Sequence, residues 1–324
     1  MQTIDHLLSL VQNEFEKQKF NSDPIELYDP IDYTMSQGGK RIRPVLCLMG
    51  CNLFDGDLES ALYPAMGIEI FHNFTLLHDD IMDNAPIRRG KETVYKKWNS
   101  NIAILSGDTM YALAYKYLIR TKSPRLSEII EVITQTAIEI CEGQQYDMNF
   151  ETMEQVSIDD YLNMIRLKTA VLLGASLKIG AIIANASNEE ADLMYKFGEN
   201  VGMAFQLKDD LLDLYSDESK FGKKTGGDII ANKKTFLYLK AIEQADETNA
   251  NKLKTLFSTL DIDNDIKVNT VKEIFNQFDV KKLTEEKMEA FYQVALGNLN
   301  QIDLSLEKKD ALKKVAEILM SRDH

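Results

Sequence analysis

The sequence has 324 residues, of which 44% are hydrophobic, so the chain can bury a substantial core as one large domain or two ordinary ones. Its 51 acidic and 37 basic residues give a net charge of −14. This balance argues against a nucleic-acid-binding surface, which requires a basic face to neutralise phosphates. A local basic pocket for a small anion remains possible, and an acidic cluster beside that anion would then need metal ions between them.

The apolar residues argue against two further classes. The most apolar stretch, residues 170–186, is interrupted by Lys178 and Asn185 and falls short of the roughly 18 residues of a membrane-spanning helix. Residues 1–20 carry acids at helical spacing, unlike a secretory signal peptide. The three cysteines imply no disulfide framework, and we expect them to be core thiols. These features predict a cytoplasmic protein without membrane insertion.

Helical periodicity dominates the chain from its start. Ile4, Leu7, Leu8, Val11 and Phe15 share the spacing of one helix face. The same periodicity recurs in residues 105–119, 126–142, 161–186, 191–214, 234–245 and 287–299, whereas strict alternation is hard to find. The glycines and prolines lie mostly between these stretches. The sequence therefore predicts a single all-α domain over residues 1–324, built from many long helices.

Two of the helical stretches contain the pattern Asp-Asp-x-x-Asp, within LLHDDIMDNAPIRRG and FQLKDDLLD. Residues four apart lie on one face of a helix, about 6 Å apart along its axis. The first and last aspartates of each pattern therefore point the same way. In chain order, the aspartates of the two patterns are Asp79, Asp80, Asp83, Asp209, Asp210 and Asp213.

The neighbours of these aspartates are apolar, which indicates buried helix faces and not solvated acidic turns. Leu76 and Leu77 precede the first pattern, and Leu211 lies within the second. Paired carboxylates on one face repel and destabilise an isolated helix by a few tenths of a kcal/mol. Carboxylate oxygens are ligands that suit Mg²⁺ together with water and phosphate oxygens. The two aspartate segments are therefore predicted to bind magnesium.

Basic residues lie close to both aspartate segments in the sequence. GGKRIRP places Lys40, Arg41 and Arg43 after a glycine pair, and Arg88 and Arg89 follow the first aspartates. The glycine-flanked stretch FGKKTGGD, which contains Lys223, follows the second. Arginine contacts phosphate oxygens through two nitrogens at once, and lysine provides a compact charge. Metal-type aspartates beside such cations predict a site for diphosphates.

Together these motifs resemble those of the trans-isoprenyl diphosphate synthases, also called polyprenyl synthetases. GGKRIRP, LLHDDIMDNAPIRRG, RLKTA, FQLKDDLLD and FGKKTGGD follow the family's order and spacing across residues 20–240. The resemblance implies the isoprenoid synthase fold, in which long helices surround a central cavity and the two aspartate segments lie on facing helices. It also implies a homodimer that condenses isopentenyl diphosphate head-to-tail with dimethylallyl, geranyl or farnesyl diphosphate.

The resemblance implies three Mg²⁺ ions per active site, which join the aspartates to the diphosphate of the allylic substrate. Asp79 and Asp83 would hold two of these ions, and Asp209 would hold the third. The aspartates that the resemblance implies to act through water or through their neighbours are Asp80, Asp210 and Asp213.

The resemblance also assigns the two substrates. The residues implied to contact the allylic diphosphate are Arg88, Lys168, Gln206, Lys223 and Lys233. Those implied to bind isopentenyl diphosphate are Lys40, Arg43, His72 and Arg89. The polar groups of Thr169 and Gln206 could stabilise the allylic cation left by ionisation, so no side-chain nucleophile is needed. The residues expected to take part in catalysis are Lys168, Thr169, Gln206, Asp79 and Asp209.

Product length is predicted from the helix that carries the first aspartates. Phe74 lies five residues before Asp79, about 7.5 Å along the axis, and Phe71 lies almost one turn further. Position 75 is threonine and not a second aromatic residue. In the family, one aromatic residue at this place resembles synthases of C20 products, whereas two resemble synthases of C15 products. We expect geranylgeranyl diphosphate, with farnesyl diphosphate as the alternative.

Two other functions fit parts of the pattern. A class I terpene cyclase also has an aspartate-rich helix, but it does not need a second diphosphate pocket. A non-catalytic subunit of a heteromeric prenyl synthase would lose aspartates, whereas this chain keeps both patterns complete. His78, directly before Asp79, is either structural or part of the site. The sequence leaves the preferred allylic primer, the downstream pathway and the dimer interface open.

Overall fold

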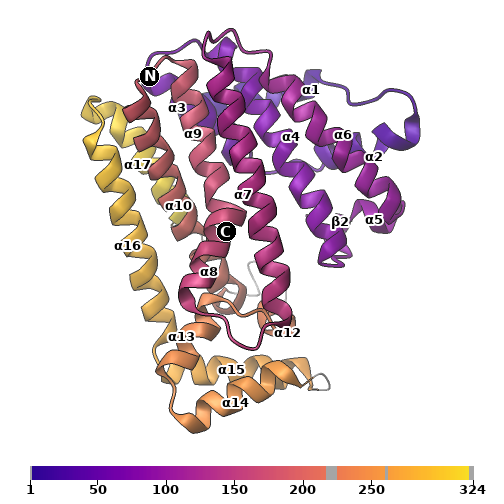
Figure 1. The fold of residues 1–324 in the computed structure, drawn as a ribbon, viewed down its shortest axis with the longest axis vertical. Coiled ribbons are helices and arrows are strands. Elements are labelled where there is room, and N and C mark those ends of the chain that lie inside the picture. The colour runs from indigo at the N-terminus through magenta and orange to yellow at the C-terminus, as the bar shows by residue number, and fades with distance from the viewer. Residues whose placement is uncertain (1, 217–224, 260–261, 321–324) are drawn as a thin grey trace. The chain divides into compact units, whose positions relative to one another are not determined.

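A computed structural model describes residues 2–216, 225–259 and 262–320 (Figure 1). Helices predominate in these ranges, which confirms the predicted all-α class. No helix in the described ranges is long and apolar enough to cross a membrane. The chain divides into two compact units, the first of residues 1–135, 175–195 and 302–311, and the second of residues 136–174, 196–301 and 312–324.

The helices and strands fall into three groups according to the compact unit that contains them. Those of the first unit are α1 (Ile4–Lys17), α2 (Ile25–Ser36), α3 (Ile42–Leu53), α4 (Leu58–Met82), β1 (Ile87–Arg88), β2 (Lys91–Glu92), α5 (Val94–Lys97) and α6 (Ser100–Leu118). Those of the second unit are α8 (Ile158–Ile165), the π-helical turn η1 (Arg166–Ala170), α12 (Gly227–Ile230), α13 (Phe236–Gln244), α14 (Glu247–Ser258), α15 (Asn264–Gln277) and α16 (Val280–Gln301). The helices that contribute residues to both units are α7 (Leu126–Thr152), α9 (Val171–Ile183), α10 (Asn188–Tyr215) and α17 (Leu306–Met320).

Helix α4 forms the centre of the first unit and packs against α3 and α6. Asp57 caps its start by accepting hydrogen bonds from the backbone N–H groups of Glu59 and Ser60. Most of the residues between Ser60 and Phe71 are buried, so this half of the helix is surrounded by protein. A helix held on several sides gives its C-terminal turn, which carries the first aspartates, a fixed direction.

Glycines allow the backbones of the first unit to approach closely. A Cβ atom at Gly180 of α9 would lie 2.0 Å from the carbonyl oxygen of Cys47 on α3, so only glycine fits there. Cys47 and Cys51 are buried as expected, and burial raises the pKa of both thiols. The expectation that every cysteine is a core thiol is wrong for Cys141, because that side chain is exposed on α7.

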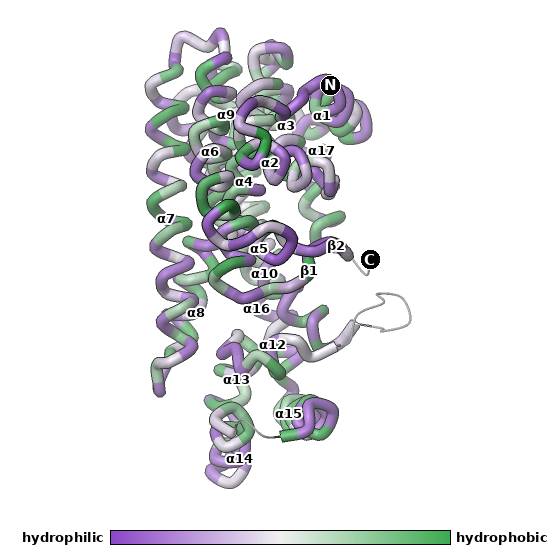
Figure 2. The backbone as a smooth tube through the Cα atoms, turned by 90° about the vertical axis from the view of Figure 1, so that its right-hand side faces the viewer, coloured by the Kyte–Doolittle hydropathy of each residue, from purple (hydrophilic) through white to green (hydrophobic). Residues whose placement is uncertain are grey.

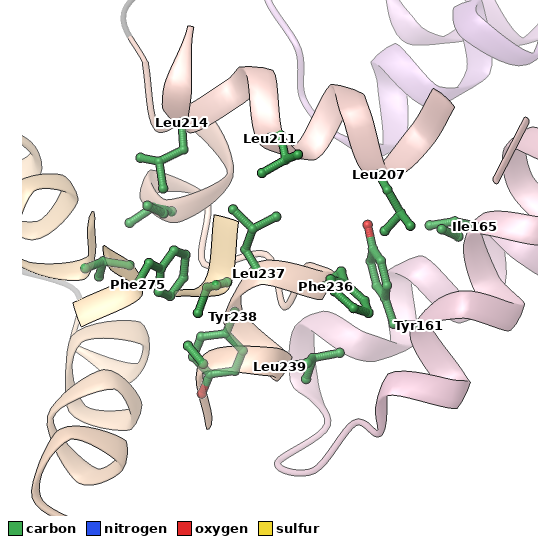
Figure 3. Packing of buried hydrophobic residues seen from close by; sticks show 14 of the residues in the cluster. Tyr161, Ile165, Leu207, Leu211, Leu214, Phe236, Leu237, Tyr238, Leu239 and Phe275 are labelled. Carbon is green, nitrogen blue, oxygen red and sulfur yellow. The ribbon is translucent and has the colours of Figure 1, made fainter. Parts of the chain in front are cut away.

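The second unit is organised around α13, whose side chains enter one apolar cluster (Figure 3). Phe236 and Leu237 of α13 are buried with Leu207 and Leu211 of α10 and with Tyr161 of α8. Burial of each large apolar side chain contributes about 1.5–3 kcal/mol. On the other side of the cluster, α14 and α15 lie side by side (Figure 1). This cluster fixes α8 and α10, which carry the second group of candidate residues.

The helical periodicity located most elements, with two differences. Helix α7 begins at residue 126 as predicted but ends at Thr152, beyond the predicted end at residue 142, and both hydrophilic and hydrophobic residues occur along its length (Figure 2). The predicted helix over residues 161–186 is instead divided by η1, where the N–H of Val171 donates to the carbonyl of Arg166. A short antiparallel hairpin of β1 and β2 was not predicted, because two-residue strands carry no periodic signal.

Candidate active site

The first aspartate segment ends α4 and divides into a buried and an accessible part. Asp80 is 5% exposed, whereas Asp79 is half-buried and Asp83, at the C-cap, is exposed. Asp83 continues the helical hydrogen bonds, since its N–H donates to the carbonyl of Asp79 at 2.8 Å. The two aspartates that the sequence assigns to metal are therefore the accessible ones.

Arg88 pairs with the buried aspartate. Its Nε donates to Oδ1 of Asp80 at 2.7 Å. Burial raises the pKa of Asp80, and the charge and hydrogen bond of Arg88 partly oppose that shift. The arginine reaches this position from the β1–β2 hairpin, in which Ile87 pairs with Glu92. The hairpin thus links the first aspartate segment to the cations that follow it in the sequence.

Arg89 lies at the turn of this hairpin in a left-handed conformation, with φ of +52°. Such a conformation costs a non-glycine residue about 1–2 kcal/mol. It directs the guanidinium to the GGKRIRP segment, where Nη1 donates to the carbonyl of Gly38. A Cβ atom at Gly39 would lie only 3.1 Å from Nη2 of Arg89, so the glycine pair makes room for the arginine. Lys40, the next residue, is exposed.

Arg41 in the same segment is buried and holds the start of α3 in place. Nη1 donates to Oε1 of Glu69 at 2.7 Å, and Nη2 donates to the carbonyl of Met35 at 2.9 Å. Asn73 completes the group, since its Nδ2 also donates to Oε1 of Glu69, at 3.3 Å. The sequence grouped Arg41 with the basic residues of a diphosphate site, whereas the structure pairs it with Glu69. Glu69 was missed, because no spacing rule connects it to this loop.

His72 contacts Arg43 in a half-buried position. Nη1 of Arg43 lies 3.1 Å from Nε2 of His72. Burial holds the pKa of His72 well below its ordinary value. The positive charges of nearby arginines, that of Arg43 above all, lower the pKa further. A guanidinium can only donate, so Nε2 accepts and the proton of the neutral ring lies on Nδ1. The predicted contacts Arg43 and His72 therefore form one cationic group.

A small pocket with room for about one water molecule lies between these groups in the first unit. Its walls combine one buried carboxylate, two guanidinium groups and apolar side chains of α4. Its lining residues are Thr34, Gln37, Asn73, Leu76, Leu77, Asp80, Arg88, Arg89, Thr93 and Val94.

The residues predicted to set product length form an aromatic group one to two turns before the aspartates. Phe74 lies with its ring centroid 5.5 Å from Phe71, 5.3 Å from Tyr111 and 4.8 Å from His78. Thr75 donates to the carbonyl of His72 at 2.8 Å. Tyr111 belongs to α6, so its approach to Phe74 could not be read from sequence spacing.

His78 is a packing residue in this structure. Its Nε2 lies 3.2 Å from the carbonyl oxygen of Ile104 on α6. A Cβ atom at Gly107 would lie 2.2 Å from the same nitrogen, so the glycine makes room for the imidazole. The structural alternative for this histidine is therefore the better one.

The second aspartate segment lies on α10 and repeats the pattern of the first. Asp209 is exposed, Asp210 is 6% exposed and Asp213 is half-buried. The hydroxyl of Tyr161 donates to Oδ2 of Asp210, and Nε2 of Gln206 donates to Oδ1 at 3.2 Å. Burial, with the charge of a nearby aspartate, raises the pKa of Asp210 to about 8.

Asp228, at the end of FGKKTGGD, lies beside Asp213. Its N–H donates to Oδ2 of Asp213 at 3.0 Å, and the N–H of Gly226 donates to the Asp213 carbonyl at 2.7 Å. Burial and the charge of Asp213 raise the pKa of the Asp228 carboxyl to about 6, and Lys233 opposes the shift. Lys233 thus lies near Asp228, whereas Lys223 lies outside the described residues.

Lys168 and Thr169 lie in the π-helical turn η1, a kind of turn that is frequent at functional sites. Nζ of Lys168 pairs with Oδ2 of Asp147 at 2.6 Å, and Oγ1 of Thr169 donates to Oε1 of Gln206 at 3.0 Å. A Cβ atom at Gly143 of α7 would lie 2.5 Å from the backbone nitrogen of Lys168, so α7 approaches the backbone of the turn closely. Asp147 and Tyr161 were missed, because no spacing rule connects them to the aspartates.

The acidic residues fit magnesium only together with other ligands. Within the described ranges, no three side chains of the metal-binding types converge on one point. Mg²⁺ commonly binds one or two carboxylates, and its remaining ligands are waters and substrate phosphates. The accessible carboxylates Asp79 and Asp83, and Asp209 and Asp213, are oxygen donors of that kind.

Comparisons with known proteins agree with this chemistry. The family model described as polyprenyl synthetase matches residues 24–278. A geranylgeranyl diphosphate synthase of Sulfolobus acidocaldarius is 37% identical over 96% of this chain and 95% of its own. A crystal structure of a geranylgeranyl pyrophosphate synthase is 43% identical, with a TM-score of 0.95 over 99% of both chains.

A further solved structure was determined with ligands. It is a polyprenyl synthase of Caulobacter crescentus complexed with calcium and isoprenyl diphosphate, 25% identical, with a TM-score of 0.88 over 99% of this chain and 98% of that one. These likenesses confirm the predicted isoprenoid synthase fold. Because the family model covers both aspartate segments and most of the sequence, the chain belongs to the polyprenyl synthetase family.

Proposed function

We propose that the protein is a prenyltransferase that condenses isopentenyl diphosphate head-to-tail with dimethylallyl, geranyl or farnesyl diphosphate, and that its main product is the C20 compound geranylgeranyl diphosphate. The observation that carries the proposal is the repeated arrangement of accessible and buried aspartates beside cations on α4 and α10. The relatives named geranylgeranyl diphosphate synthase favour C20 over C15.

We assign the metal to three of the accessible carboxylates. Asp79 and Asp83 would hold two Mg²⁺ ions and Asp209 would hold a third, while the remaining aspartates would act through water or through their neighbours. Bound Mg²⁺ supplies positive charge that stabilises the diphosphate as it leaves. The burial of Asp80 and Asp210, each hydrogen-bonded to protein, supports their supporting role.

The chain's own residues bind and orient the substrates. Cationic side chains hold the allylic diphosphate, and dipoles stabilise the allylic cation that remains when its C–O bond breaks. The oxygens of Thr169 and Gln206 supply these dipoles, and the hydrogen bond between the two side chains, which holds both in position, supports this role. The double bond of isopentenyl diphosphate then attacks, and the departed diphosphate accepts the proton. The allylic contacts are Arg88, Lys168, Gln206, Lys223 and Lys233, and those to isopentenyl diphosphate are Lys40, Arg43, His72 and Arg89.

We further propose that residues 1–324 act as one prenyltransferase domain, and that two copies form a homodimer. Four helices contribute residues to both compact units, which supports a single functional domain. Ile104 and Leu105 on α6 and Ile119 at its C-cap are large exposed apolar residues, and a second copy would cover them. Three free cysteines suit a reducing compartment, which supports a cytoplasmic location. Equilibrium sedimentation of the purified protein tests the dimer.

The decisive experiment incubates the protein with Mg²⁺, isopentenyl diphosphate and dimethylallyl diphosphate, and identifies the dephosphorylated products by mass. We expect linear all-trans alcohols with C20 dominant. Asp209→Ala should abolish product, whereas Glu189→Ala, an acidic residue at the start of the same helix, should not. Cyclic products would indicate a terpene cyclase, and no product would indicate a non-catalytic subunit. A dominant C15 product would retain the reaction and refute the length assignment.

A further inference from the structure

We propose that Tyr161 is a positioning residue for the second aspartate segment and acts through its hydrogen bond to Asp210. The inference deepens the proposed function, since it concerns the same metal-binding carboxylates. Neither the aspartate pattern nor the spacing of α10 points to a tyrosine on another helix. The structure does so by placing its hydroxyl on the buried carboxylate.

Tyr161 is held firmly from two directions. Its helix starts with a capping box, in which Ser157 and Asp160 satisfy each other's backbone N–H groups. Its ring, 4% exposed, packs in the apolar cluster with Ile165 and Leu207. In Figure 3 the hydroxyl points toward the ribbon of α10. The ring therefore has little freedom, and the hydroxyl gives the aspartate a fixed point of attachment.

Asp210 connects Tyr161 to Gln206 and, through Gln206, to Thr169. Its other oxygen accepts from the Gln206 amide at 3.2 Å, and the oxygen of that amide accepts from Thr169 at 3.0 Å. Because the amide nitrogen faces the carboxylate, the amide oxygen must face the threonine. Asp209, adjacent along the helix, is exposed. Tyr161 thus determines the orientation of Gln206 and steadies the turn that presents Asp209.

The test is Tyr161→Phe, which removes the hydroxyl and keeps the ring. The matched control is Tyr238→Phe, a buried tyrosine of the same apolar cluster whose ring packs on Phe257. Binding of Mn²⁺ in the presence of inorganic diphosphate is measured from the paramagnetic resonance signal of free Mn²⁺, without any turnover. We expect about tenfold weaker Mn²⁺ binding for Tyr161→Phe, in line with the loss of one hydrogen bond to a buried carboxyl group. The control should match the wild-type protein.

Kinetics separate positioning from a general loss of structure. Tyr161→Phe should raise the Mg²⁺ concentration for half-maximal activity and lower kcat, with the KM for isopentenyl diphosphate unchanged. In an Asp210→Asn background, Tyr161→Phe should have no further effect on Mn²⁺ binding, because the carboxyl group through which the tyrosine acts is already absent. Mn²⁺ binding by Tyr161→Phe equal to wild type, or additive effects in the double variant, would overturn the inference.

Two further cases have their own interpretation: the variant does not fold, or the wild-type protein makes no prenyl product. If Tyr161→Phe does not fold, Asp210→Asn alone must show the weaker Mn²⁺ binding, and wild-type binding by that variant refutes the inference. If the wild-type protein makes no prenyl product but Tyr161→Phe still weakens Mn²⁺ binding, the proposed function fails and the positioning role stands.

Discussion

Removing the charge of Glu69 should cost the protein about 3 kcal/mol of stability. Glu69 is 2% exposed, and its Oε1 accepts from Arg41 at 2.7 Å and from Asn73 at 3.3 Å. Loss of one partner of a buried ion pair costs about 3–5 kcal/mol, because the other charge stays buried without compensation. Glu69→Gln keeps one acceptor oxygen and creates no cavity, so the lower end of this range applies. An unfolding entropy of about 2 cal/mol/K per residue then gives a fall in Tm of about 4 °C.

Calorimetric melting of the metal-free protein measures the effect. Glu59→Gln is the matched control, since Glu59 lies on the same helix, is 86% exposed and pairs with Lys122 at 3.9 Å. Exposed pairs of this kind contribute about 0–1 kcal/mol. Equal Tm values for the two variants would show that the buried pair does not stabilise the start of α3.

Three other outcomes follow from the structure. Phe74→Ala should lengthen the main product beyond C20, and an unchanged product distribution would show that this ring does not limit the chain. Because the pKa of Asp210 in the folded protein is raised to about 8, the folded state holds the proton more tightly than the unfolded state. Stability of the metal-free protein should therefore fall as pH rises from about 4 to 8, with a flatter Tm profile for Asp210→Asn. Gly107→Ala should lower stability by about 1–3 kcal/mol through its clash with His78, whereas Gly297→Ala, with open space around it, should be neutral or stabilising in thermal melts.

The sequence was sufficient for groups whose neighbours lie close along the chain. Asp79 and Asp83 are four residues apart on a helix, so periodicity alone placed both on one side of α4. The apolar residues beside them predicted correctly that part of this segment is buried. The motifs also sufficed to identify the family.

Contacts between distant segments could not be predicted in the same way. Arg41 and Glu69 are separated by 28 positions, and Tyr161 and Asp210 by 49. Arg41 precedes α3 and Glu69 lies on α4, while Tyr161 and Asp210 lie on α8 and α10, and a single sequence does not specify which of these residues meet. From the sequence, Arg41 could therefore be a solvated loop residue and Tyr161 an ordinary core residue. The assignments of individual substrate contacts remain predictions.

The π-helical turn η1 changes the angle between two side chains, that of Tyr161 on α8 before the turn and that of Thr169 within the turn. Tyr161 and Thr169 are eight residues apart, so a regular α-helix would rotate them about 80° from one another around its axis. A π-helical turn holds more residues per turn than an α-helix, so η1 makes this angle smaller. Their partners Asp210 and Gln206 lie one turn apart on a single face of α10. The turn thus helps to align two donors with two acceptors, without any distortion of the helix that carries the aspartates.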